Sequence, residues 1–216
     1  MKFFRLEQSV DQKIVGIYPA FETGYLPVNI EDPRLILNIF YEKVTGKEVY
    51  VPVPKLRKGA KCIDFFEGPA TREIISDKLK EIILQTNPIG LEFLPQKIIK
   101  GSIEIDGYWL TNNYEFDFSA IDFTKTEISI MKGVWDVDYS IRANNLEGFL
   151  GLLEEINFSK RVKIFRPYFH ENYPRDFFAL RHVYSGFSFF CSERFREKLE
   201  AEKITGIRYM ELDEVL

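Results

Sequence analysis

Two stretches of this chain share one pattern at a fixed separation of 116 residues, and this internal repeat constrains the fold more than any other feature. Residues 76–81 (SDKLKE) recur as 192–197 (SERFRE), and residues 89–94 (IGLEFL) recur as 205–210 (TGIRYM). In each copy a serine can cap a helix, an acidic residue follows in the first turn, and a glycine ends the helix before a strand. The repeat predicts two helix-then-strand units with a structural role, although two similar units can also arise by chance.

A second pattern, alternation between apolar and polar residues, dominates residues 101–140. Such alternation is typical of an antiparallel meander that is covered on one face. Turn-forming residues separate the alternating segments, namely Gly107, Asn112–Asn113 and Lys132–Gly133. The predicted strands of this meander are residues 103–105, 114–118, 127–131 and 134–139.

Caps and periodicity predict further elements along the chain. Asp32–Pro33 opens a predicted helix that Gly46 ends, and Asn144–Asn145 caps another. The apolar stripe of the first is Leu37, Phe40, Tyr41 and Val44, and that of the second is Leu146, Phe149, Leu150 and Leu153. Additional strands are predicted at residues 13–18, 47–53 and 162–165.

The predicted fold class is α+β, with a mostly antiparallel sheet or sheets flanked by three or four helices. The patterns allow one continuous domain, or an N-terminal lobe of residues 1–100 and a C-terminal lobe of residues 101–216. The segment Pro95–Gly101 is the expected boundary between such lobes. A chain of 216 residues with 45% hydrophobic content can bury a substantial core, so disorder is excluded as its main state.

Charge and composition narrow the classes of partner. The 29 Lys and Arg residues are outnumbered by 33 Asp and Glu residues, which argues against a protein that binds nucleic acid non-specifically. No apolar run approaches the roughly 18 residues of a membrane span, and the start of the chain turns charged before a signal-peptide core could form. We therefore expect a cytoplasmic protein with neither nucleic acid nor membrane as its partner.

Motifs for catalysis or for cofactor binding are absent from the sequence. There is no phosphate-binding glycine loop, and residues 185–188 only approach a nucleophile elbow. Cys191 with His170 or His182 could form a thiol nucleophile and base, but a cysteine in such an apolar setting is more often a buried filler. Two cysteines and two histidines show no metal-binding spacing, so we predict no metal, no cofactor and no catalytic residue.

Four short motifs resemble those of a large bacterial family of polymorphic-toxin immunity proteins, long filed as a domain of unknown function. The motifs are residues 108–112 (YWLTN), 120–122 (AID), 164–166 (IFR) and the closing 204–209 (ITGIRY), and in order and spacing they cover about residues 105–212. Asn113–Tyr114 departs from the family pattern, in which an aliphatic pair is expected. The resemblance implies a non-enzymatic cytoplasmic protein that binds and neutralises a partner toxin.

The alternating segment carries most of the chain's excess of acid. Between residues 101 and 140 eight carboxylates face only two lysines, and aromatic residues are interleaved with them. This can be a solvated sheet face, or a surface that steers and anchors a basic toxin such as a nuclease domain. The candidate partner-binding residues are Tyr108, Trp109, Glu115, Asp117, Trp135, Asp136 and Asp138.

Two alternatives to toxin binding remain open from the sequence. A pair of the carboxylates in residues 101–140 could serve a hydrolase acting on a sugar or nucleotide. The chain could also be a regulatory adaptor. Two nearby charged residues have simpler expected roles, because Asp122 can cap a turn at Thr124, and Arg166 can form an internal ion pair with the acidic strands.

Overall fold

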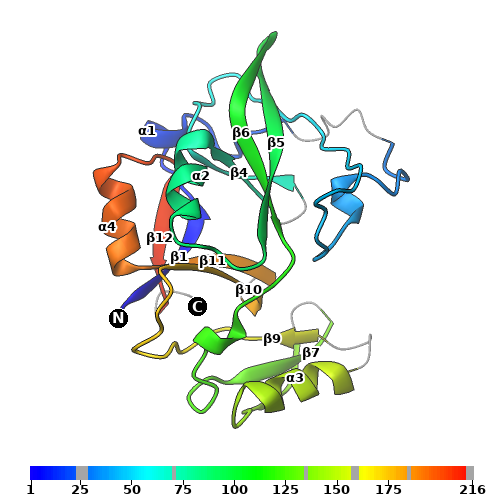
Figure 1. Ribbon diagram of the computed structural model, residues 1–216, viewed down its shortest axis with the longest axis vertical. Coiled ribbons are helices and arrows are strands. Elements are labelled where there is room, and N and C mark those ends of the chain that lie inside the picture. Colours follow the sequence, from blue (N-terminus) through cyan, green and yellow to red (C-terminus); the bar gives the residue numbers. More distant parts are fainter. Residues whose placement is uncertain (23–28, 70–71, 134–135, 157–160, 184–185, 213–216) are drawn as a thin grey trace. The chain divides into compact units, whose positions relative to one another are not determined.

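The computed structural model describes residues 1–216 except 23–28, 70–71, 134–135, 157–160, 184–185 and 213–216. It has the α+β architecture that the sequence predicts (Figure 1). The chain divides into two compact units, each built from separate stretches of sequence. The first unit comprises Met1–Leu6, Phe116–Arg196 and Tyr209–Leu216, and the second comprises Glu7–Glu115 and Glu197–Arg208.

The first unit contains most of a four-stranded sheet and all of a three-stranded one. The four-stranded sheet has the order β10 (Phe177–Val183), β11 (Gly186–Ser192), β1 (Phe3–Gln8), β12 (Ile207–Glu211). The three-stranded sheet has the order β8 (Asp136–Ile141), β7 (Ile128–Lys132), β9 (Arg161–Lys163), and α3 (Leu146–Glu155) belongs to the same unit. Phenylalanines dominate the core, in which Phe118, Phe149, Phe178 and Phe190 are buried with Phe3.

The second unit is built on a five-stranded sheet. Its order is β2 (Lys55–Leu56), β5 (Leu91–Lys100), β6 (Ile103–Asn113), β4 (Glu73–Ser76), β3 (Phe65–Glu67). The long β5–β6 hairpin is prominent in Figure 1. The helices are α1 (Gln12–Val15) and α2 (Asp77–Leu84), and the division between the units falls inside α4 (Glu193–Ala201). A separate core buries Ile36, Phe66, Ile74, Ile98 and Leu110.

The helix-then-strand repeat is confirmed in both copies. The hydroxyl oxygen of Ser76 accepts the Leu79 N–H (3.2 Å) before α2, and that of Ser192 accepts the Phe195 N–H (3.1 Å) before α4. The glycines that lead into β5 and β12 have positive φ angles, +60° at Gly90 and +89° at Gly206, which a side chain would disfavour.

The repeat also extends upstream of the serines, to an Asp-Phe-Phe triplet in each copy. Asp64 and Asp176 each precede the first strand of a hairpin whose second strand ends at the capping serine. The carboxylate of Asp64 accepts the Ser76 hydroxyl (2.7 Å), and that of Asp176 accepts the Ser192 hydroxyl (2.6 Å). The pairing register agrees as well, because Phe65 faces Ile75 and Phe177 faces Cys191, each one residue before the serine.

The two sheets therefore share one plan but obtain their middle strand differently. The order β3–β4–β6–β5 in one sheet corresponds to β10–β11–β1–β12 in the other. In the first copy the middle strand β6 follows β5 through a tight turn at Gly101. In the second copy β1, from the other end of the chain, occupies that position. The two sheets thus share four strands in corresponding order, and one of the four comes from a different place in the chain.

Several local predictions for the N-terminal half were wrong. Residues 33–46 form only a short 3-10 helix, Ile36–Asn38, because Tyr41 has a positive φ of 56° and Phe40, 56% exposed, finds no apolar surface to cover. The predicted strand at 13–18 is instead the helical turn α1, capped by Asp11. The predicted strand at 47–53 is reduced to one bridge, between Tyr50 and Leu35.

The predicted meander over residues 101–140 is also corrected. Its first strand grows into β6, while residues 114–118 form no strand, because the Asp117 carboxylate accepts the Ser119 N–H (3.3 Å) and caps a 3-10 helix over Phe118–Ala120. The later segments become β7 and β8, in a different sheet. The predicted boundary at Pro95–Gly101 lies within the β5–β6 hairpin, whereas the division in this region follows Glu115.

The helix after Asn145 is confirmed, with a corrected stripe. The side chain of Asn145 accepts the Gly148 N–H (2.8 Å) at the start of α3. Phe149 is fully buried, but Leu150 is 43% exposed. The strand predicted at 162–165 corresponds to β9 and a bridge at Ile164.

Candidate partner-binding sites

The predicted partner-binding residues do not form one surface, because they lie in different units and in different environments. Tyr108, Trp109 and Glu115 belong to the second unit, and Asp117, Asp136 and Asp138 to the first. Trp135 lies outside the described residues. Two separate candidates result, the outer strand β8 and a groove beside Trp109.

Strand β8 presents acidic and apolar side chains from one edge of the three-stranded sheet. Its neighbour β7 is almost completely buried, with Ile128 and Ile130 inaccessible to solvent. On β8, by contrast, every residue from Asp136 to Ser140 is exposed, including Val137 at 49% and Tyr139 at 45%. We call Asp136, Val137, Asp138 and Tyr139 the β8 surface.

A bulge shapes the β8 surface. Ile130 pairs with Tyr139 and Met131 with Val137, so Asp138 is an additional residue on the outer strand. Bulges and charged side chains both disfavour the addition of a further strand to a sheet edge. The addition of a strand is therefore disfavoured at this edge, and carboxylates and an aromatic ring are exposed there.

Asp117 has a structural role, contrary to its predicted place on a binding surface. Its carboxylate pairs with the Arg175 guanidinium (3.0 Å) and accepts the Tyr173 hydroxyl (2.5 Å), and its side chain is only 13% exposed. Burial and this hydrogen bond raise the pKa of Tyr173 above its usual range. Glu115 is exposed but follows the end of β6 in the other unit.

A groove of about 470 Å³ lies beside Trp109 in the second unit. The indole N–H donates to the Asp77 carboxylate, and the Lys80 ammonium lies 3.3 Å from the centroid of the ring. Trp109 is thus held in place and half-buried, whereas Tyr108 is buried. The polar residues that line this Trp109 groove are Asp77, Gln96, Lys97 and Asp106, and Val51, Val53 and Pro95 add apolar walls.

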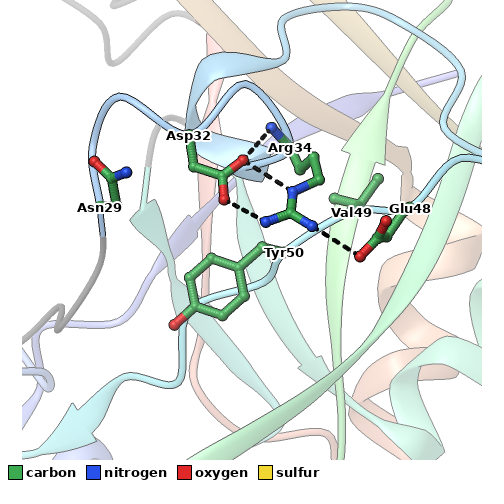
Figure 2. Close-up of a pocket in the computed structure, with 6 residues that line it drawn as sticks. All are labelled: Asn29, Asp32, Arg34, Glu48, Val49 and Tyr50. Carbon is green, nitrogen blue, oxygen red and sulfur yellow. Dashed lines mark hydrogen bonds and ion pairs between the residues drawn. The ribbon is translucent and has the colours of Figure 1, made fainter.

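A second, smaller pocket of about 320 Å³ surrounds Arg34 (Figure 2). The guanidinium binds both carboxylate oxygens of Asp32 (2.8 and 3.1 Å) and one of Glu48 (2.9 Å). Hydrogen bonds from Arg34 lower the pKa of Asp32 to about 2. The charges of this cluster pair with one another, which indicates that they stabilise the segment between Asn29 and Tyr50.

A pair of glutamates that the sequence did not single out faces across the β3–β4 hairpin. Glu67 and Glu73 are register partners, and the Tyr18 hydroxyl donates to Glu67 (2.9 Å). Loss of hydration, followed by the charge of Glu67, raises the pKa of Glu73 to about 8. No short motif could reveal this pair, since the two residues meet only when the hairpin closes.

Two of the three remaining sequence predictions have structural outcomes. Asp122 accepts the N–H (3.2 Å) and hydroxyl (2.6 Å) of Thr124, which confirms its role in capping a turn. Cys191 is fully buried in β11, as expected of a packing residue. The internal ion pair of Arg166 stays a prediction.

Within the described parts of the chain, no group of three or more His, Cys, Asp or Glu side chains is placed to hold a metal ion. Over the same residues, no helix is long and apolar enough to cross a membrane. No family model and no curated protein sequence gives a significant match to the chain.

Proposed function

We propose that this chain is an immunity protein, which binds a cognate bacterial toxin in the cytoplasm and neutralises it by occlusion, without catalysis of its own. The observation that carries the proposal is the β8 surface, where two carboxylates and two apolar side chains are exposed on the strand beside the largely buried β7. Aromatic anchors beside steering charges are typical of protein interfaces. The motif resemblance of residues 105–212 supports the same class.

The acidic character of the β8 surface favours a basic partner. Asp136 and Asp138 would accelerate the encounter with a positively charged toxin domain, such as a nuclease, and Val137 and Tyr139 would bury apolar area once the complex forms. The bulge at Asp138 disfavours self-association through the edge. Occlusion therefore requires only complementary side chains at this surface.

The test is co-expression with a candidate toxin from the neighbourhood of this gene, scored by survival and by a co-purifying complex. The charge reversals Asp136→Lys and Asp138→Lys, made together, are expected to weaken binding by about tenfold or more and to abolish protection. The matched control is Glu154→Lys with Glu155→Lys on α3, where two exposed acids receive the same change of charge. Equal protection by both double variants would refute the proposed surface.

A carboxylate-dependent hydrolase is the second candidate, and the pair Glu67 and Glu73 is the observation that favours it. Glycoside hydrolysis uses a pair of carboxyl groups, one of which has a raised pKa, as Glu73 has. Release of sugar or nucleotide products, lost in Glu73→Gln while toxin binding persists, would support this class. Neutralisation by Glu73→Gln at wild-type level, with no turnover by either protein, would eliminate it.

A further inference from the structure

Cys62 and Lys100 are in direct contact at the surface of the second unit. Both residues are exposed, and the Lys100 ammonium donates to the Cys62 sulfur across 3.9 Å. The other cysteine of the chain, Cys191, is fully buried in β11. An oxidant in solution therefore reaches Cys62 first, and it reaches a sulfur that already has a primary amine beside it.

The fold brings this sulfur and this nitrogen together from separate segments. Lys100 ends β5 and pairs with Leu56 of β2, and the chain leads on from β2 to Cys62. Tyr108 of β6 is 8% exposed, and burial, the charges of Cys62 and Asp64 and a hydrogen bond with Cys62 raise its pKa above the usual range. A buried hydroxyl therefore positions the sulfur, while the amine reaches it from the surface.

The neighbouring lysines have other partners. Lys61, next to Cys62 in the sequence, donates to the Lys13 carbonyl (2.7 Å). Lys97 pairs with two carboxylates (2.9 and 3.7 Å). Lys100, by contrast, makes no ion pair with a carboxylate of the described residues, and its contact is the one with the sulfur. Of these three amines, that of Lys100 is the one placed to react with an oxidised Cys62.

We propose that Cys62 and Lys100 form a redox-sensitive cross-link, a sulfur–nitrogen bond that is made on exposure to a peroxide. In the first step the Cys62 thiol reduces one hydrogen peroxide, so that an O–O bond breaks, an S–O bond forms, and the products are a sulfenic acid and water. In the second step the Lys100 ammonium loses a proton to solvent and the amine attacks the sulfur. The S–O bond breaks as the S–N bond forms, and the oxygen leaves as a second water.

The cross-link would join the segment before β3 to the tip of the β5–β6 hairpin. It closes the stretch from residue 62 to residue 100 in the unfolded chain, so the melting temperature should rise by about 5 °C or more. A thiol reductant reverses the reaction, because its thiolate attacks the sulfur and releases the amine, and a second thiol then frees Cys62 as a disulfide of the reductant forms.

Mass spectrometry of the whole chain after brief treatment with hydrogen peroxide tests the proposal. The wild type is expected to lose about 2 Da, the mass of two hydrogen atoms, and to regain it with dithiothreitol. A glutamate-specific protease should then release residues 49–67 joined to residues 93–104. Lys100→Arg keeps the positive charge but lacks the amine, so its cross-linked fraction is expected to fall about tenfold or more. Lys97→Arg, in the same peptide, is the matched control and should cross-link normally.

Other products would overturn the assignment. An unchanged mass loss in Lys100→Arg would place the bond on another nitrogen, such as the backbone N–H of Ile63. Oxidation of the wild type only to a sulfinic acid, or to a disulfide between two chains, would show that the amine does not capture the sulfur. Cys62→Ser should abolish the product, and its persistence there would point to Cys191. The β8 double variant should cross-link normally, so this result is independent of toxin binding.

Discussion

Single ionisable residues in this protein lie where water cannot fully solvate their charged form, and Glu73 is the clearest case. Its pKa is raised to about 8 by loss of hydration and by Glu67, so the folded state holds a proton that the unfolded chain would release. The protonated carboxyl contributes fully to the free energy of unfolding below about pH 4.5, the pKa of a glutamate in the unfolded chain. This contribution is lost as the pH rises through 8.

Replacing Glu73 with glutamine should remove this loss of stability at high pH. We expect the free energy of unfolding of the wild type to fall by about 2 kcal/mol more than that of Glu73→Gln between pH 5 and pH 9, after allowance for solvent screening. Urea denaturation at the two pH values measures the difference, with Glu115→Gln as the control for an exposed acid. Parallel pH profiles for wild type and Glu73→Gln would contradict the assignment.

At the scale of elements, the same capping device stabilises both copies of the repeat. Each serine accepts a helix N–H and donates to an aspartate upstream, Asp64 or Asp176. The serines and glycines could be predicted from the sequence, because a cap and its helix are neighbours along the chain. The aspartates could not, since they lie 12 and 16 residues before their serines and meet them only through a hairpin.

Loss of either cap should weaken the fold to a different extent. Ser76→Ala is expected to cost about 1 kcal/mol, and Ser192→Ala about 2 kcal/mol, because Ser192 is fully buried and its loss leaves Asp176 without that donor. Urea denaturation of the variants tests this order. Ser102→Ala, in the exposed β5–β6 turn, serves as the control and should be neutral. Equal costs at the two caps would show that burial does not set the difference.

The candidate sites illustrate a similar limit. Alternation correctly marked the acidic and aromatic content of β8, because side-chain period depends on neighbouring residues alone. It could not assign β6 and β8 to different sheets, nor bring Gln96 beside Tyr108, because those contacts depend on pairing between distant segments. Asp117 was misassigned for the same reason, since its partners Tyr173 and Arg175 lie more than 50 residues away.

At the scale of the whole molecule, the shared strand order relates β1 to β6, although β1 is far along the chain from the other strands of its sheet. β6 and β1 hold equivalent places, and the ion pair of Lys2 with Glu211 (2.6 Å) joins the start of β1 to the end of β12. A circular permutant that starts at Ser9 and carries β1 after β12, through a glycine-rich linker, would reproduce the connection seen between β5 and β6.

This permutant is expected to fold, with a melting temperature within about 5 °C of the parent, because it keeps every strand pair. Far-ultraviolet circular dichroism and thermal unfolding measure the outcome. A permutant opened at Gly107, inside β6, is the control and should be strongly destabilised, since it cuts the middle strand of the other sheet. Loss of structure in the first permutant alone would argue against the equivalence of β1 and β6.

The place of β1 in the chain has a consequence for synthesis. Residues Phe3–Gln8 leave the ribosome roughly 180 residues before β11 and β12, their neighbours in the sheet. At about 5–20 residues per second, this strand waits roughly 10–40 s for its partners. β1 therefore reaches its native pairing long after it is made, and the nascent chain must keep its apolar side chains from other contacts until β11 and β12 have been translated.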